Sequence, residues 1–221
     1  MELQWKEVST DHIVTDEWID FRKSVYRLPD GRDIGPFYTY SRRDYVVIVA
    51  LDEEGRYICV KQFRQGIREV TTEFPAGGLE RTDGKQYRSG SISDPENAAE
   101  AAENASGNAD HAADNAENAA DASENALDAA KRELQEETGY MSEEWSHLLT
   151  IPSNATISDN YAHIYLARNC RRISGQSLDE YEFLNVILHT EDEIRSMIRA
   201  GLFQQSVHVL AFLLAGQDTA R

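Results

Sequence analysis

Apolar residues occur along the chain in short runs that are typical of β-strands. Residues 45–51 form one continuous apolar run, and residues 57–60 form a second after the turn Asp52-Glu53-Glu54-Gly55. Two such runs joined by a polar turn predict a buried β-hairpin. Similar patterns predict three more strands, over residues 70–74, 163–167 and 183–188.

The N-terminal region carries aromatic and apolar residues in two stretches, 18–28 and 37–40. Between them lies the turn sequence Pro29-Asp30-Gly31, in which proline and glycine favour a reversal of the chain. This part of the sequence therefore predicts a β-hairpin or a β-meander within residues 1–40.

Three later segments have the pattern of helices. Residues 127–137 predict the first, and a Thr-x-x-Glu capping box opens the second over residues 190–198. Residues 206–215 predict an amphipathic last helix that ends at Gly216. Strands and helices mix without the regular alternation of a parallel α/β sheet, so the pattern predicts an α+β fold.

Residues 84–123 differ from the rest of the chain in composition and in repetition. From Glu96 the sequence repeats every seven residues, and the fifth unit begins at Glu124. Alanines in these units alternate at spacings of four and three residues, which is the seam of a coiled coil. One interpretation is a solvated or disordered spacer. The other is a long helix from Pro95 to Glu137 whose alanine seam packs on another helix.

Composition narrows the class of protein. The 221 residues suffice for one domain with a core and an appendage, and the net charge of −17 argues against nucleic acid or an anionic membrane as a partner. Cys59 lies in an apolar strand pattern, so Cys59 and Cys170 are predicted to be free thiols in a reducing compartment. Because no segment has the pattern of a membrane span or a secretory signal, we expect a cytoplasmic protein.

Charged groups concentrate in one short stretch, where Arg132, Glu133, Glu136 and Glu137 fall within six residues. On a helix, Glu133 and Glu137 are i,i+4 neighbours with Glu136 beside them. Three carboxylates on one face repel one another unless a cation lies among them, and hard oxygen ligands suit Mg²⁺ or Mn²⁺. The alternative is an ordinary solvated acidic face.

These residues and an upstream glycine turn resemble the Nudix box, Gly-x5-Glu-x7-Arg-Glu-U-x-Glu-Glu-x-Gly-U, in which U is a bulky apolar residue. The second half of the box is matched in full, from Glu124 to Tyr140. In the first half, Gly78 is followed by five residues that end at Asp83, but the next residue is Gly84, where the box requires a glutamate. If residues 84–123 are removed, Asp83 meets Glu124 and the pattern is restored. The chain therefore resembles a Nudix hydrolase whose box is split by a 40-residue insertion.

The resemblance implies the Nudix α/β/α sandwich, a mixed sheet between helices, with added N-terminal strands and a long helical or flexible insertion. We expect residues 1–40 to form the N-terminal strands and residues 84–123 to form the insertion. Residues 41–83 and 124–221 would make up the catalytic domain.

The resemblance also implies roles for single residues. It assigns four metal ligands, which are the backbone carbonyl of Gly77 and the carboxylates of Glu133, Glu136 and Glu137. Arg132 is expected to orient one of these glutamates by a bidentate contact. Gly77 and Gly78 would let the backbone approach the substrate closely, and Glu124 would brace the junction of loop and helix.

Three further segments are similar to the ADP-ribose pyrophosphatase branch: Val60-Lys61-Gln62-Phe63-Arg64, Glu73-Phe74-Pro75-Ala76-Gly77 and Leu178-Asp179-Glu180-Tyr181-Glu182. On that resemblance Glu180 is the first choice of general base and Glu182 the second. Arg64 would clamp a substrate phosphate or pair with Glu73. Residues 152–160 depart from the branch, because Ala155 occupies the place of its Ser-Pro-Gly, and this leaves the preferred sugar open.

The resulting hypothesis is a Mg²⁺-dependent or Mn²⁺-dependent pyrophosphatase that converts ADP-ribose, or a related nucleoside diphosphate sugar, to AMP and ribose 5-phosphate. A homodimer joined through the N-terminal strands is expected. The rival hypothesis is a catalytically impaired nucleotide-binding or assembly scaffold, in which the split loop misplaces the glycine turn and the helical insertion packs on a partner helix. A third interpretation regards the repeats as an engineered or slipped expansion of the helix start.

Overall fold

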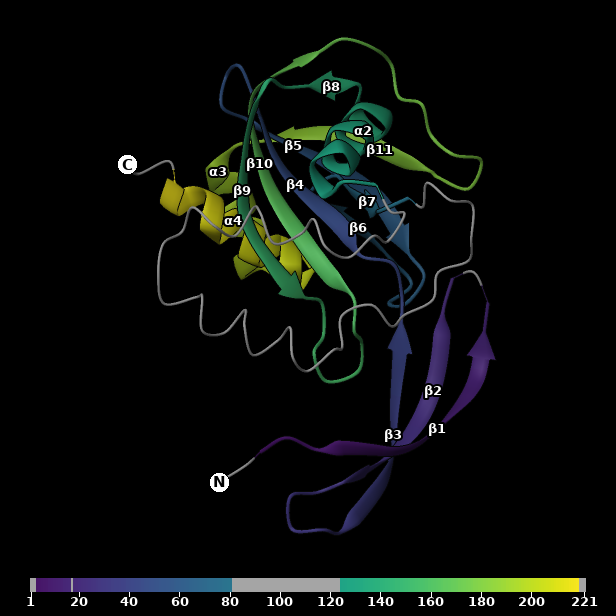
Figure 1. Ribbon diagram of the computed structural model, residues 1–221. Coiled ribbons are helices and arrows are strands. Elements are labelled where there is room, and N and C mark those ends of the chain that lie inside the picture. The colour runs from purple at the N-terminus through teal and green to yellow at the C-terminus, as the bar shows by residue number, and fades with distance from the viewer. Residues whose placement is uncertain (1–2, 17, 81–123, 219–221) are drawn as a thin grey trace. The chain divides into compact units, whose positions relative to one another are not determined.

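The structure is a computed structural model that describes residues 3–16, 18–80 and 124–218 (Figure 1). The predictions for residues 84–123 therefore lie outside the described residues, apart from where the segment meets the rest of the chain. The described residues divide into two compact units, one up to Arg42 and the other formed by residues 43–80 with residues 124 onward.

The first unit is a three-stranded antiparallel sheet in the order β1-β2-β3. Its strands are β1 (Lys6–Thr15), β2 (Asp20–Arg27) and β3 (Asp33–Ser41). The predicted hairpin corresponds to β2 and β3 and is confirmed. Strand β1 was not predicted, because its sequence is mostly polar and nearly all of it is exposed. Aromatic rings hold it locally, with the ring centroid of Trp5 lying 5.6 Å from that of Phe37.

The second unit contains a mixed sheet with the strand order β11-β5-β4-β10-β8. Strands β6, β7 and β9 pair with β5, β4 and β10 respectively, and only the β4–β10 pairing is parallel. The strands are β4 (Tyr45–Asp52), β5 (Tyr57–Arg64), β6 (Glu69–Glu73), β7 (Ala76–Gly78), β8 (Tyr140–Met141), β9 (Glu144–Pro152), β10 (Tyr161–Arg172) and β11 (Leu184–His189). The five strands predicted in this unit are confirmed, whereas β7, β8 and β9 were not predicted.

One edge of β4 is shared between two partners, and this places the glycine turn. Near the end of β4, Ala50 and Leu51 pair with β5. Near its start, Val46 lies opposite Gly77 in β7. Because β5 pairs with only two residues of β4, the short strand β7 can add to the sheet beside it. The glycine turn is thus part of the sheet and has a fixed position.

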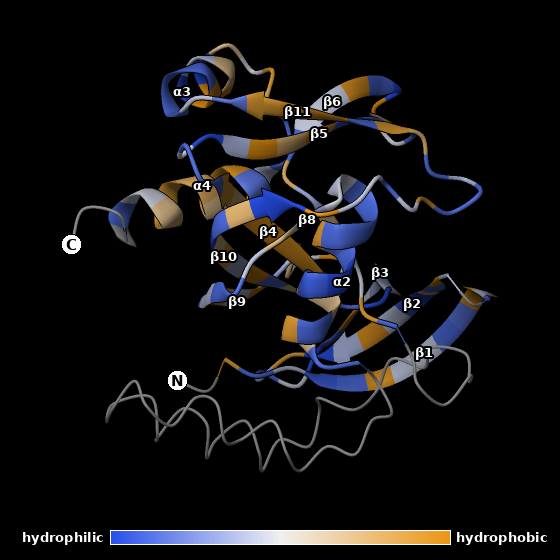
Figure 2. Cartoon of the chain, turned by 90° about the horizontal axis from the view of Figure 1, so that it is seen from above, coloured by the Kyte–Doolittle hydropathy of each residue, from blue (hydrophilic) through white to orange (hydrophobic). Residues whose placement is uncertain are grey.

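Helices cover both faces of this sheet, as the α/β/α sandwich requires (Figures 1 and 2). They are α2 (Ala126–Thr138), α3 (Glu191–Arg199) and α4 (Ser206–Asp218). Alternate residues of β4 point to opposite faces of the sheet and pack in different hydrophobic clusters. Val46 and Ile48 pack in the cluster that contains Leu134 of α2, whereas Val47 and Val49 pack in the cluster of α3 and α4. The predicted fold class is confirmed.

The predicted helix over residues 127–137 is confirmed as α2, but one of the two interpretations of the repeats and the predicted end of the last helix are wrong. Helix α2 does not continue back into the insertion, because Asn125 has extended backbone angles of φ −63° and ψ 136° and caps the helix through its side chain. The long helix from Pro95 to Glu137 is therefore excluded. Helix α4 continues through Gly216 to Asp218. A helical glycine costs only about 1 kcal/mol, which does not stop a helix whose Ala215 is still buried.

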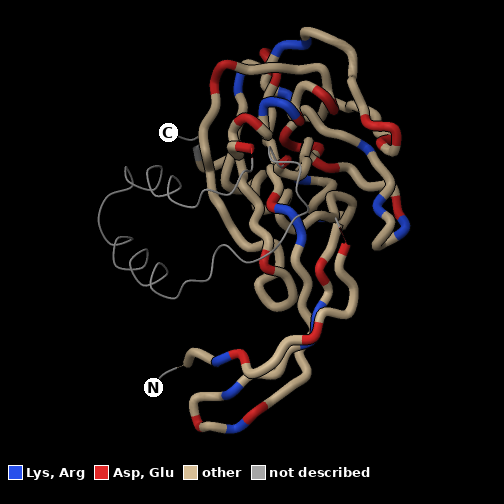
Figure 3. The backbone as a smooth tube through the Cα atoms, turned by 45° about the vertical axis from the view of Figure 1, so that its right-hand side comes forward, with Lys and Arg blue, Asp and Glu red and all other residues tan. Residues whose placement is uncertain are grey.

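Two other sequence expectations, those for the cysteines and for membrane-spanning segments, can be compared with the structure. Cys59 and Cys170 are both buried, free thiols, as predicted, and burial raises the pKa of Cys170 to about 12. None of the helices in the described residues has both the length and the hydrophobicity to cross a membrane. Lys and Arg positions are interspersed with Asp and Glu positions along the described backbone of each unit (Figure 3).

Candidate active site

The glycine turn and the glutamate-bearing helix are in direct contact. The backbone N–H of Ala76 donates a 3.0 Å hydrogen bond to Oε2 of Glu137, across 61 residues of sequence. Gly77 lies against the carboxyl group of Glu133, because a Cβ atom added at Gly77 would be 1.9 Å from its Cδ atom. The geometric expectation on which the split-box interpretation depends is therefore confirmed, and the misplaced turn assumed by the scaffold hypothesis is not observed.

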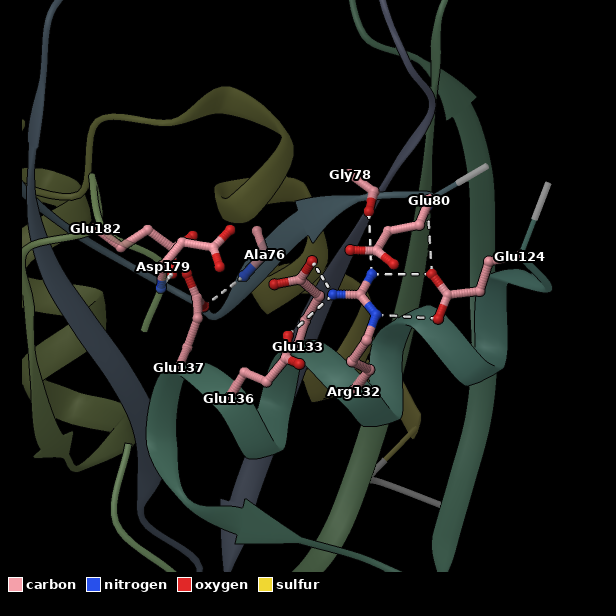
Figure 4. Close-up of polar contacts among 10 residues, drawn as sticks. All are labelled: Ala76, Gly78, Glu80, Glu124, Arg132, Glu133, Glu136, Glu137, Asp179 and Glu182. Carbon is pink, nitrogen blue, oxygen red and sulfur yellow. Dashed lines mark hydrogen bonds and ion pairs between the residues drawn. The ribbon is translucent and has the colours of Figure 1, made fainter. Parts of the chain in front are cut away.

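Arg132 connects the parts of the box (Figure 4). Its Nε and Nη2 atoms form a bidentate contact with Glu124, at 3.0 and 2.9 Å. Its Nη1 atom donates to both Glu133 and Glu136, at 2.9 and 3.0 Å, and Nη2 also donates to the carbonyl of Gly78 at 3.2 Å. The sequence predicted the bidentate contact for one of the ligand glutamates. The structure gives it to Glu124, whereas Glu133 and Glu136 each receive one hydrogen bond from Arg132.

Glu124 joins the two ends of the segment that interrupts the box. Its backbone N–H donates to the carbonyl of Glu80 at 2.8 Å, and the N–H of Glu80 donates back to the Glu124 carboxylate at 3.3 Å. The charge of Arg132 and its hydrogen bonds hold the pKa of Glu124 below its usual range. Glu124 therefore braces the junction of loop and helix as predicted, and the chain leaves and re-enters the site at one point.

Glu133 and Glu137 form a buried pair of carboxyl groups. Burial raises the pKa of Glu133 to about 7 against the lowering effect of Arg132, and the charges of Glu136 and Glu182 raise it further. Burial also raises the pKa of Glu137 well above its usual range, and the charge of Glu133 adds to this effect. Two acids in such surroundings resist ionisation unless a positive charge lies between them.

The donor set fits a hard divalent cation in composition. Carboxylate oxygens of Glu133, Glu136 and Glu137, with a glycine carbonyl beside them, are the ligands that Mg²⁺ and Mn²⁺ prefer. In the described part of the chain, no three acidic, histidine or cysteine side chains are already grouped to hold a metal ion. One reason why the acidic side chains are not grouped is that the half-exposed carboxylate of Glu136 is turned to Arg132. Binding a cation would require Glu136 to leave that hydrogen bond or Glu133 and Glu137 to be the main ligands.

Of the two predicted general bases, only Glu182 is linked to the buried pair. Its charge acts on both Glu133 and Glu137, and its carboxylate accepts a 3.1 Å hydrogen bond from the N–H of Asp179. Figure 4 shows Glu182 beside Glu137. Glu180 is one of the two central residues of the turn that Glu182 closes on Asp179, and its side chain is exposed. The geometry thus favours Glu182, the second choice given by the sequence, as the candidate base.

Arg64 pairs with Glu73, which is one of the two alternatives that the sequence left open. Its Nη2 and Nε atoms donate to the fully buried Glu73 carboxylate at 2.6 and 2.9 Å. Thr71 and Gln205 donate to the same carboxylate. Burial alone would raise the pKa of Glu73, but the hydrogen bonds and charge of Arg64 lower it. The Arg64 side chain keeps 33% of its surface exposed, so it is fixed in place without being enclosed.

The segment that departs from the pyrophosphatase branch folds back on itself between β9 and β10. The N–H of Ser153 donates to the carbonyl of Asn160, and the N–H of Ser158 donates to the carbonyl of Asn154. Asn160 is buried and donates to the carbonyl of Arg43 at 3.2 Å. Several polar groups of this segment are thus used within the loop or against Arg43, whereas Ala155 is exposed.

No protein-family model matches the chain. It is 23% identical over 213 residues to a methanol dehydrogenase activator of Bacillus methanolicus, in an alignment that covers 93% of this chain and 89% of that protein. It is also 23% identical over 205 residues to an ADP-ribose pyrophosphatase of Bacillus subtilis, covering 90% and 85% of the two chains. Among solved structures, that of an ADP compounds hydrolase superposes with a TM-score of 0.67 at 15% identity, over 98% of this chain and 95% of that one.

The comparisons support the resemblance to Nudix hydrolases and show that the fold is shared with an ADP compounds hydrolase.

Sequence reasoning missed several residues that hold the site together. Ala76 acts through its backbone N–H, which no side-chain motif can reveal. His208 accepts a 3.1 Å hydrogen bond from the N–H of Phe74, although 134 residues separate the two. Gln176 donates to the carbonyl of Glu137 at 2.8 Å. The only signals in the sequence were a histidine within the predicted last helix and a glutamine in a segment to which no element or motif was assigned.

Proposed function

We propose that this chain is a metal-dependent Nudix hydrolase that cleaves a nucleoside diphosphate linked to another moiety, with ADP-ribose as the leading substrate and AMP and ribose 5-phosphate as the products. The observation that carries the proposal is the contact of the glycine turn with Glu133 and Glu137 across the interrupted box. A scaffold without turnover has no need to keep two buried, mutually repelling carboxyl groups.

The residues that would hold Mg²⁺ or Mn²⁺ are the predicted ones, namely the carbonyl of Gly77 and the carboxylates of Glu133, Glu136 and Glu137. When bound, the cation would neutralise charge on the phosphate oxygens of the substrate. Arg132 holds Glu133 and Glu136 from one side, and the N–H of Ala76 holds Glu137 from the other. Glu133 and Glu137 are therefore oriented before the substrate arrives, whereas Glu136 would join the cation by leaving its hydrogen bond with Arg132.

Glu182 is the proposed general base, which would take a proton from the attacking water. Its carboxylate lies near Glu137, on which its charge acts, whereas the Glu180 side chain is exposed. A base must reach the proton that it removes, so position outweighs the order of the two residues in the sequence.

Arg64 is the proposed contact for a substrate phosphate. Its pairing with buried Glu73 fixes the guanidinium group near the site, where the charge of Glu137 acts on it. A pre-oriented guanidinium loses little freedom when it binds a phosphate oxygen. A named relative that is an ADP-ribose pyrophosphatase supports ADP-ribose as the first substrate to try.

We also propose that two protomers associate through the N-terminal strands. Large apolar side chains of this unit are exposed, with Trp18 at 64% and Tyr38 at 52%. Such side chains are more often covered in a complex than left in water. Light scattering coupled to gel filtration measures the mass directly, and a monomer at micromolar concentration would refute the pairing.

The decisive experiment is a hydrolysis assay on ADP-sugars, dinucleoside polyphosphates and NADH, with added Mg²⁺, with Mn²⁺ and with EDTA. Nucleotide products such as AMP are separated by chromatography, or the phosphate that an added alkaline phosphatase frees from the monoester products is measured. We expect turnover of ADP-ribose that EDTA abolishes and added metal restores. The variant Glu137→Gln should lose activity while keeping its fold by circular dichroism. Absence of turnover on every substrate would refute the enzyme, and turnover in EDTA would refute the metal requirement.

A further inference from the structure

The C-terminal end of α2 is held by one short segment, residues 173–177. The last carbonyl groups of a helix have no partner within the helix and must be satisfied from outside. Here the N–H of Ser177 donates to the carbonyl of Glu136 at 2.9 Å, and Nε2 of Gln176 donates to the carbonyl of Glu137 at 2.8 Å. The N–H of Ile173 donates to the carbonyl of Gly139 at 2.9 Å. This segment therefore binds the same turn that carries two of the candidate metal ligands.

Gln176 makes a second contact that connects this turn to the sheet. The same Nε2 atom donates to the carbonyl of Leu184 at 3.4 Å. Leu184 is buried and begins β11, where it lies opposite Gln62 of β5. One side-chain amide thus joins the end of α2 to the start of β11.

The Leu178–Phe183 loop lies between these two anchor points. It begins directly after Ser177 and ends directly before Leu184, so both of its ends are fixed at Gln176. Within the loop, Glu182 and Asp179 hold each other through two hydrogen bonds, at 3.0 and 3.1 Å. Tyr181 and Phe183 are 88% and 85% exposed, so little packing holds the loop from outside. Its position depends mainly on its two ends.

We propose that Gln176 is a positioning residue, whose amide fixes the Leu178–Phe183 loop to the last turn of α2 and thereby holds the Glu182 carboxylate at the metal ligands. This inference rests on the proposed function, since it assigns Gln176 a role through the general base. It goes beyond that function because Gln176 belongs to no motif and touches none of the reacting groups.

Two substitutions separate the hydrogen bonds of Gln176 from its size. Gln176→Met keeps a side chain of similar length but has no N–H to donate, whereas Gln176→Lys keeps a donor that reaches the same carbonyl groups. A cation near a helix C-terminus is favourable, so the lysine variant should fold at least as well as the methionine variant. The position is exposed, so neither change opens a cavity.

The kinetic readout distinguishes positioning from general stability. A misplacement of about 1 Å costs on the order of 100-fold in rate, so Gln176→Met should lower kcat about 10- to 100-fold. KM and the Mg²⁺ concentration for half activity should be unchanged, and Gln176→Lys should recover most of the loss. In a Glu182→Gln background, Gln176→Met should cause no further loss, because residues that act through one group are not additive.

Hydrogen exchange of the loop gives a readout that needs no turnover. Amides of residues 179–184 should exchange faster in Gln176→Met than in the wild type or in Gln176→Lys. Unchanged exchange, or faster exchange with unchanged kcat, overturns the positioning role. The positioning role is also overturned if Gln176→Met lowers kcat in the Glu182→Gln background by the same factor as in the wild type. If the wild type hydrolyses no substrate, the proposed function and this inference fail together. If the wild type is active and Gln176→Met is equally active, only this inference fails.

Discussion

The contact between Gly77 and Glu133 yields the sharpest test of the site, because the next residue is also a glycine. A Cβ atom at position 77 would lie 1.9, 2.0 and 2.2 Å from the three carboxyl atoms of Glu133. Ordinary contact begins near 3.4 Å, so the carboxyl group of the Gly77→Ala variant must retreat by about 1.5 Å. At Gly78 an added Cβ meets its nearest neighbour, Cδ of Arg43, at 3.8 Å, which is an ordinary contact.

Neither glycine has a positive φ, so alanine is compatible with both backbones and the variants differ mainly in the contact with Glu133. We expect Gly77→Ala to lower kcat/KM by at least about 100-fold, the cost of a misplacement of this size at a reacting centre. Gly78→Ala should lose less than about tenfold, since alanine at a tolerant glycine changes stability by only about 1 kcal/mol.

The assay is metal-dependent hydrolysis, accompanied by Mn²⁺ binding measured by electron paramagnetic resonance. Gly77→Ala should weaken Mn²⁺ binding as well as turnover, because a candidate ligand is displaced. Thermal unfolding of both variants checks that they are folded. Equal activities in the two alanine variants would show that Glu133 need not occupy its observed position, and the assignment of the ligands would then be wrong.

Three further outcomes are expected. Glu182→Gln should lower kcat by about 100-fold or more at saturating Mg²⁺ whereas Glu180→Gln changes it little, and the opposite result would restore Glu180 as the base. Burial lowers the pKa of His208 in the folded protein to about 4; the charge of Glu73 opposes this shift and that of Arg64 adds to it. Folding therefore favours the neutral imidazole, and this contribution to stability is complete above the unfolded pKa of 6.5. The free energy of unfolding should therefore fall by up to about 3 kcal/mol as the pH drops from 7 to 4. Urea titrations should show a smaller fall for His208→Asn, which keeps an acceptor for the N–H of Phe74, and an equal fall would assign the effect to other groups. Replacing residues 81–123 by a four-residue Gly-Ser linker should keep kcat and, if the segment is a flexible loop, raise the free energy of unfolding by about 2 kcal/mol. A loss of stability would instead show that the segment contributes packing of its own.

The sequence predicted the local parts of the site well because their determinants are short in range. The positions of Arg132 and the glutamates on α2 follow from helical spacing, and Gly139 ends the helix with φ 75°, where a Cβ atom would meet the carbonyl of Ser174 at 2.4 Å. The contact of Glu124 with Arg132 spans only eight residues, yet it was not predicted, because the resemblance assigned the bidentate contact to a candidate ligand glutamate.

What the sequence could not give depends on which strands and turns meet in space. Short β7 has no periodicity of its own and exists because β4 has a free edge beside β5. The choice between Glu180 and Glu182 depends on a turn whose direction no residue pattern specifies. The hydrogen bond from Phe74 to His208 depends on the packing of α4 against the sheet.

The interrupted box raises the question of why such a site tolerates extra chain at this point. Closing a loop of 43 residues, in place of one of about five, costs about 2 kcal/mol in chain entropy, because the cost grows only with the logarithm of length. Arg132 donates two hydrogen bonds to Glu124, which is largely shielded from solvent, and each such bond to a charged group contributes on the order of 2 kcal/mol. The added reciprocal pair between Glu80 and Glu124 lies outside the inserted residues. The interactions among Glu80, Glu124 and Arg132 thus offset the chain entropy of closing residues 81–123 whatever their sequence is, so the glycine turn keeps its contact with Glu133 and Glu137.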